Sequence, residues 1–104
     1  METLREKQSR FVYMVARLID HAYENGYEFT FGHAFRCKDC PTGSEVSLHK
    51  DRLAIDLNLF KDGVYMTKTS DYFKLGKFWE ELGGTWGGRF SDGNHFSLEH
   101  EGRK

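Results

Sequence analysis

Two short segments of the sequence carry side chains that bind metals and move protons. His49 and Asp56 are separated by six residues, and Asp92 comes three residues before His95. Two imidazoles and one carboxylate form a ligand set of catalytic zinc sites, which keep the fourth coordination position open for water. Asp92 supplies a further carboxylate that is placed to handle the proton of that water. These residues therefore point to metal-assisted hydrolysis.

Asp56 lies in residues 52–60, the segment with the clearest strand pattern. Because successive side chains of a strand point to opposite faces, Asp56 is predicted on the face opposite Ile55 and Leu57. A carboxylate within a strand needs a partner, since burying an unpaired charge is costly. Other interpretations of single residues stay open: Asp56 on an exposed sheet face, His49 in a solvated loop, and Asp92 as a turn-forming residue.

The surrounding segments predict an α+β fold, with a small antiparallel sheet and flanking helices. Apolar residues at helical spacing predict a helix over residues 4–23, and alternation predicts a strand over 27–31. Residues 36–47 are expected to form a loop, and residues 61–63 a hairpin turn into a strand at 64–66. Thr69 or Ser70 is expected to cap a second helix, which residues 83–84 end. A glycine-rich loop over 85–94 and a last strand over 95–98 complete the prediction.

Length and composition limit the classes of function. The 104 residues suit a single domain, 1–104, and the net charge of −1 gives no basic field for nucleic acid. No stretch approaches the roughly 20 apolar residues that span a bilayer, and the charged N-terminus does not resemble a secretory signal. We therefore expect a monomer that is made in the cytoplasm and does not insert into membranes.

Cys37 and Cys40 form a C-x-x-C pair, with His33 nearby. A structural zinc site needs four ligands, and a fourth ligand is missing locally. Two free thiols in a loop are the favoured interpretation, and a labile disulfide is the alternative.

From about residue 30 to residue 98 the sequence resembles the zinc peptidases of the D-alanyl-D-alanine carboxypeptidase superfamily, which cleave bacterial peptidoglycan stem peptides. Their pattern S-x-H-x6-D, followed by an acidic residue three before a histidine, is matched by Ser47, His49, Asp56, Asp92 and His95. Residues 79–88 also resemble the W-x-x-L-G-x-x-W-G-G stretch of that superfamily. The resemblance implies a fold of the Hedgehog/DD-peptidase type.

The resemblance also implies roles for individual residues. His49, Asp56 and His95 would hold one Zn²⁺ ion, and Asp92 would carry protons between water and the leaving amine.

Three further residues are implied to contact the substrate: Arg36, Ser47 and Trp86. The guanidinium of Arg36 would stabilise a developing oxyanion or bind a substrate carboxylate. An ordinary surface arginine and an ordinary core tryptophan are the alternatives for Arg36 and Trp86.

An aspartate at position 92 resembles the phage endolysins that cut the L-alanyl-D-glutamate bond, whereas carboxypeptidases and dipeptidases of this superfamily generally carry glutamate. We therefore expect an endolysin-type peptidase that acts on cell-wall peptidoglycan or muropeptides after its release during phage or prophage lysis. A D-alanyl-D-alanine carboxypeptidase or dipeptidase is the first alternative. A non-catalytic zinc-containing binding domain, as in Hedgehog signalling, is the alternative from another class.

Overall fold

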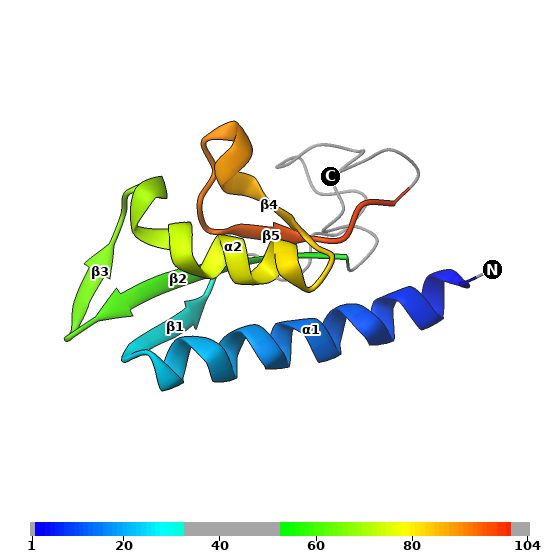
Figure 1. Ribbon diagram of the computed structural model, residues 1–104, viewed down its shortest axis with the longest axis horizontal. Coiled ribbons are helices and arrows are strands. Elements are labelled where there is room, and N and C mark those ends of the chain that lie inside the picture. The colour runs from blue at the N-terminus through cyan, green and yellow to red at the C-terminus, as the bar shows by residue number, and fades with distance from the viewer. Residues whose placement is uncertain (1, 33–52, 101–104) are drawn as a thin grey trace.

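Strand β2 (Ala54–Lys61) is the central element of the fold. The structure is a computed structural model that describes residues 2–32 and 53–100. In these residues, five antiparallel strands form one sheet in the order β1-β2-β5-β4, with β3 paired to β2 (Figure 1). The other strands are β1 (Tyr27–Phe31), β3 (Val64–Met66), β4 (Thr85–Trp86) and β5 (His95–Ser97). The predicted α+β class with a small antiparallel sheet is confirmed.

Helix α1 (Leu4–Glu24) begins and ends where the sequence predicts, within one residue. Thr3 and Glu6 form a reciprocal capping box, with the backbone N–H of Glu6 donating to the Thr3 hydroxyl at 3.1 Å. The chain leaves the helix through Gly26, whose φ of +84° favours glycine. One face of α1 is buried at helical spacing, through Phe11, Met14, Leu18 and Ala22.

The prediction that Thr69 or Ser70 caps the second helix is wrong, because Tyr72 is the residue at that position. Residues Thr69–Tyr72 form a 3-10 turn (η1), and the α-helix α2 covers Phe73–Glu81. Asp71 closes the turn, because its carboxylate accepts the backbone N–H of Lys68 at 3.1 Å. Thr69 and Ser70 therefore do not cap α2, although the predicted buried residues Leu75 and Trp79 do face the core.

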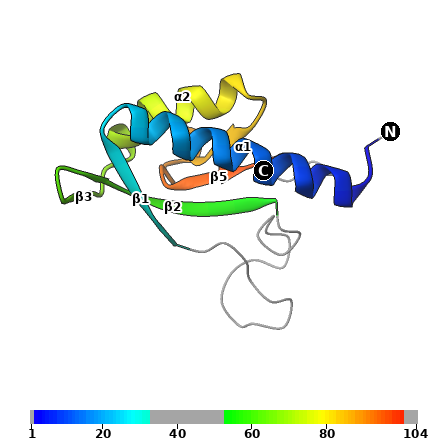
Figure 2. The ribbon, with the colours of Figure 1, turned by 90° about the horizontal axis from the view of Figure 1, so that it is seen from below.

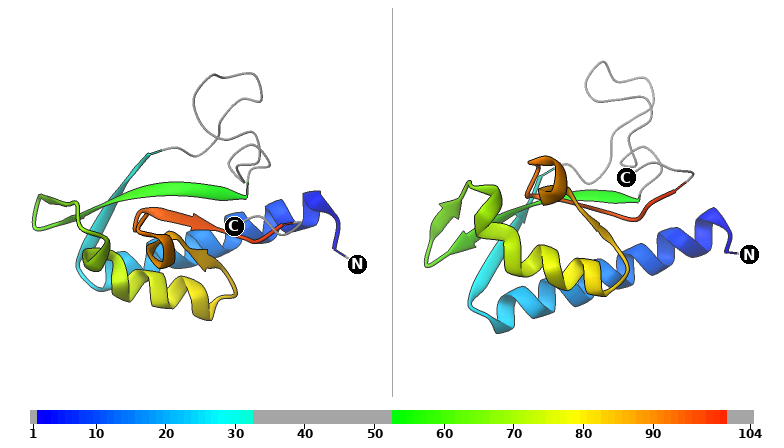
Figure 3. Two further views of the ribbon diagram at one scale, coloured as in Figure 1. Left: turned by 90° about the horizontal axis from the view of Figure 1, so that it is seen from above. Right: turned by 45° about the horizontal axis from the view of Figure 1, so that its top comes forward.

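Both helices lie on the same side of the sheet (Figures 2 and 3). The side chains of β2 alternate accordingly: Leu57 and Leu59 are fully buried in the core, while Asp56 and Asn58 are partly exposed. The sheet thus has one apolar face under the helices and one face that carries polar side chains.

Residues 85–94, predicted as a continuous loop, contain the two-residue strand β4 and a 3-10 turn, η2 (Gly87–Phe90). Two tryptophans hold this region and β5 in place. The indole N–H of Trp79 donates to the carbonyl of Ser97 at 2.9 Å, and that of Trp86 donates to the carbonyl of Gly93 at 2.8 Å. Buried indole N–H groups need such partners, so each ring fixes both packing and backbone position.

Gly76 in α2 makes room for the indole of Trp86. A Cβ at this position would lie 2.0 Å from the Trp86 ring, which is itself buried. Glycine normally weakens a helix relative to alanine. Its presence in α2 is explained by packing, because any larger residue at position 76 would collide with the Trp86 ring.

We expect Gly76→Ala to destabilise the protein, opposite in sign to the usual effect of this substitution in a helix. Overpacking of a core generally costs about 1–3 kcal/mol, which exceeds the gain of about 1 kcal/mol in helix propensity. Urea unfolding would measure the change, with Lys77→Ala at the neighbouring exposed position as the control. A stabilised Gly76→Ala variant would contradict the close packing against Trp86.

Candidate metal and catalytic site

The pairing of β2 with β5 brings together two residues that are far apart in the sequence. Asp56 lies directly opposite His95 in the antiparallel register. The Nδ1 atom of His95 is 3.4 Å from Oδ1 of Asp56, and the two side chains are only 11% and 16% exposed. Directly opposed residues in an antiparallel pair present their side chains on the same face. An imidazole and a carboxylate thus meet on the face of the sheet that the helices leave open.

The end of β1 approaches the same point. The backbone N–H of Gly32 donates to the carbonyl of Asp56 at 2.7 Å, and a Cβ on Gly32 would lie 3.0 Å from the Cβ of Asp56. Next along the face, the Asn94 amide donates to Oδ1 of Asn58 at 3.2 Å. The lack of a side chain at Gly32 therefore leaves space beside Asp56, and polar groups continue along the sheet.

Asp92 lies on the turn that leads into β5. Its backbone N–H donates to the carbonyl of Gly87 at 2.8 Å, and its carbonyl accepts the N–H of His95 at 3.1 Å. A Cβ on Gly87 would lie 2.1 Å from the Asp92 carbonyl oxygen and 2.6 Å from the Cβ of His95. The backbone of Asp92 is fixed while its side chain is exposed. This position suits a turn residue and also a carboxylate that must reach a substrate.

Trp86, predicted to contact the substrate, is only 3% exposed. Its ring packs edge-on against Phe73, with centroids 6.1 Å apart, and against Gly76. The structure thus gives Trp86 a packing role in the core, and a contact with the substrate stays a prediction.

Several predicted site residues lie outside the described residues: Arg36, Ser47 and His49, together with Cys37 and Cys40. Within residues 2–32 and 53–100, no three or more His, Cys, Asp or Glu side chains gather in a way that could hold a metal ion. The described part of the chain thus provides two of the three predicted zinc ligands, Asp56 and His95. Their chemistry fits zinc, which binds imidazole nitrogen and carboxylate oxygen.

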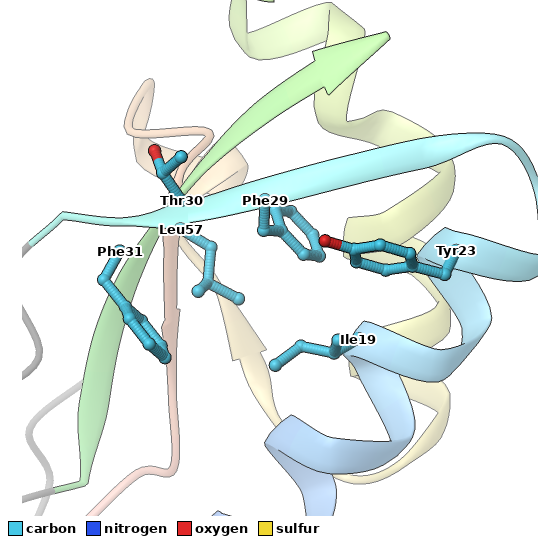
Figure 4. A pocket seen from close by; sticks show the side chains of 6 residues that line it. All are labelled: Ile19, Tyr23, Phe29, Thr30, Phe31 and Leu57. Atoms are coloured by element: carbon cyan, nitrogen blue, oxygen red, sulfur yellow. The ribbon is translucent and has the colours of Figure 1, made fainter.

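An apolar pocket lies on the side of the sheet that the helices cover. Phe29, Phe31 and Leu57 point from the sheet toward α1, where Ile19 and Tyr23 complete an apolar space of about 200 Å³ (Figure 4). The described residues that line it include no acidic or basic side chain, and it opens on the face opposite Asp56. These described residues therefore offer none of the groups that hydrolysis requires.

Two features of η2 were not predicted from the sequence. The half-exposed ring of Phe90 lies 5.9 Å from the His95 ring, centroid to centroid. Arg89 of η2 forms a bidentate ion pair with Glu80 of α2. Its Nε and Nη2 atoms each lie 2.8 Å from a carboxylate oxygen of Glu80. Their positions depend on η2, which the sequence pattern did not reveal.

Residues 41–98 match the family described as D-alanyl-D-alanine carboxypeptidase. The match covers more than half of the chain, and the chain belongs to this family. Membership makes it a hydrolase of the peptidase class, with peptidoglycan as the substrate that the family implies. No curated protein matches the chain. Among the described residues, no helix is long and apolar enough to cross a membrane.

The Glu80–Arg89 pair predicts a pH dependence of stability. Hydrogen bonds from Arg89 hold the pKa of Glu80 below its ordinary value. A carboxyl group with a lowered pKa in the folded state stabilises the protein above its unfolded pKa, and this contribution is lost as the pH falls. We expect Glu80→Gln to lower the melting temperature slightly at pH 7, because exposed ion pairs contribute little. The difference should shrink as the pH falls below the ordinary glutamate pKa of about 4.3, and it should vanish below the lowered pKa of Glu80 in the folded state.

Thermal melts of both proteins between pH 7 and pH 3 would test this. Glu81→Gln, at the exposed neighbouring position, is the matched control and should show no such convergence. A constant difference between Glu80→Gln and wild type at all pH values would contradict the prediction.

Proposed function

We propose that this protein is a zinc peptidase that hydrolyses an amide bond in peptidoglycan stem peptides, with the L-alanyl-D-glutamate bond as the preferred one. The observation that carries the proposal is the cross-strand pair of Asp56 and His95, whose Oδ1 and Nδ1 atoms are 3.4 Å apart on the face of the sheet opposite the helices. Family membership supports the peptidase class. The endolysin-type bond rests on the aspartate at position 92.

In this proposal His49, Asp56 and His95 hold the metal. His49 precedes Leu53, the first described residue before β2, by four positions, so the extended chain would place it within about 14 Å of Leu53. Bound zinc would supply positive charge that polarises the scissile carbonyl and makes a water molecule more acidic. The surrounding fold restricts the motion of Asp56 and His95, since both side chains are largely buried.

Asp92 is the proposed proton carrier. Its carboxylate would accept a proton from the attacking water and deliver it to the leaving amine nitrogen as the C–N bond breaks. Its exposed side chain on a hydrogen-bonded turn allows contact with a substrate without a change in the backbone. Arg36 is proposed to bind an anionic group of the substrate, which the D-glutamate residue would provide.

A D-alanyl-D-alanine carboxypeptidase is the second candidate, and the description of the matched family favours it. Digestion of purified muropeptides followed by mass spectrometry separates the two. New D-glutamate N-termini are expected from the preferred reaction. Release of terminal D-alanine would assign the carboxypeptidase reaction instead.

We expect His95→Ala to lose bound zinc, because a ligand is removed from a three-ligand site. Elemental analysis after dialysis should find about one zinc per wild-type chain and far less in the variant. His21→Ala is the control, since His21 stacks on Phe78 in the helix layer and should be dispensable for zinc. Full zinc occupancy in His95→Ala would rule out this ligand.

Asp92→Asn should keep zinc and the fold but lose turnover by about 100-fold to 10,000-fold, the usual contribution of a general acid or base. Rates of muropeptide cleavage and zinc content measured on the same sample would test this. Asp62→Asn is a suitable control, because Asp62 is an exposed aspartate in the β2–β3 turn. Wild-type turnover in Asp92→Asn would leave Asp92 as a turn residue only.

A further inference from the structure

A polar cavity lies directly beside Asp92, between η1 and the turn that leads into β5. Its volume is about 210 Å³, and residues of both segments and of β3 line it. The two segments pack tightly at Gly93, where a Cβ would lie 2.8 Å from the Cα of Thr69. The cavity thus adjoins the proposed proton carrier, in a position where part of the substrate could bind.

The lining of the cavity is rich in neutral hydrogen-bonding groups. Thr67, Thr69 and Ser91 contribute hydroxyls, and Asn94 contributes a side-chain amide. The half-exposed ring of Tyr65 also lines the cavity and stacks on Phe60, with ring centroids 5.3 Å apart. Hydroxyls and an amide can both donate and accept hydrogen bonds, and an aromatic face packs against C–H groups. This combination suits a carbohydrate.

Charge indicates which side of the scissile bond the cavity serves. Asp92 is the sole charged residue among those described as lining it. A substrate carboxylate placed there would be repelled by Asp92, so the D-glutamate side of the bond is disfavoured. On the other side, a single L-alanine separates the scissile bond from the lactyl group of the amino sugar. That sugar is neutral, carries hydroxyl and acetamido groups, and lies one residue from the reaction.

We propose that the cavity beside Asp92 binds the N-acetylated amino sugar that carries the stem peptide. The inference rests on the proposed function and extends it, because it makes the glycan part of what the enzyme recognises. Thr67 and Tyr65 act in binding: the hydroxyl of Thr67 bonds to the sugar and the ring of Tyr65 packs against it. The hydroxyl of Tyr72 is already used, since it accepts the N–H of Leu59 and donates to the carbonyl of Met66, both at 3.0 Å.

The test compares two substrates of the same zinc-loaded protein: a disaccharide-linked stem peptide, and the same peptide with an N-terminal acetyl group in place of the sugar. We expect Thr67→Val and Tyr65→Ala to raise KM for the sugar-linked substrate by about fivefold to tenfold, as for the loss of one good contact. Their kcat for that substrate, and both constants for the sugar-free peptide, should stay near wild type. Val64→Ala is the control, because Val64 is exposed on the same strand but on its opposite face.

The sugar site would be overturned if the wild type had equal KM values for both substrates. It would also be overturned if the variants raised KM equally for both substrates, or if they raised KM for neither. Failure of the proposed function would look different, because the wild type would then release no D-glutamate N-termini from either substrate. Circular dichroism melts of each variant would exclude unfolding as the cause of a raised KM.

Discussion

The antiparallel pairing of β2 with β5 is the constraint on which the candidate site depends. It places Asp56 opposite His95, and a shift by one residue would move one of the two side chains to the helix-covered face. Because β5 covers only His95–Ser97, the ladder alone provides few hydrogen bonds to fix this register. Flanking bonds extend it, from the Leu57 N–H to the Asn94 carbonyl and from the Leu98 N–H to the Leu53 carbonyl, each 2.9 Å long.

The helix layer contributes to the same register through the two tryptophans. Trp79 donates a hydrogen bond to the carbonyl of Ser97, after His95, and Trp86 donates one to the carbonyl of Gly93, before His95. The backbone on both sides of His95 is therefore bonded to side chains of the core. The glycines of the region fit around these rings: a Cβ on Gly84 would lie 2.0 Å from Nε1 of Trp79, and one on Gly88 2.2 Å from the Trp86 ring. The stretch of tryptophans and glycines that resembles the peptidase superfamily therefore has a physical role in packing, and this packing positions His95.

The sequence predicted those parts of the fold whose patterns extend over several residues. The helical repeat of α1, the alternation in β1 and β2, and the face taken by Asp56 all follow from periodicity. Strand β4 has two residues, too few to show a period, and η2 follows from packing around Trp86. The pairing of Asp56 with His95 is a tertiary contact between residues 39 positions apart, which periodicity does not predict. The resemblance to the peptidase superfamily implied that the two residues share a site, and the structure provides the distance between them.

The proposed metal ligands and the proposed proton carrier have different physical requirements. Groups that hold an ion must be rigid, and Asp56 and His95, the proposed ligands among the described residues, are largely buried and held by the sheet. A group that exchanges protons with water and substrate must be accessible, and Asp92, the proposed proton carrier, is exposed on a turn whose backbone is fixed by bonds to Gly87 and His95. Since the Asp92 carbonyl bonds to the N–H of His95, movement of one would displace the other. This backbone link offers a physical reason for the three-residue spacing of D-x-x-H, because that spacing closes the turn and leaves both side chains available for chemistry.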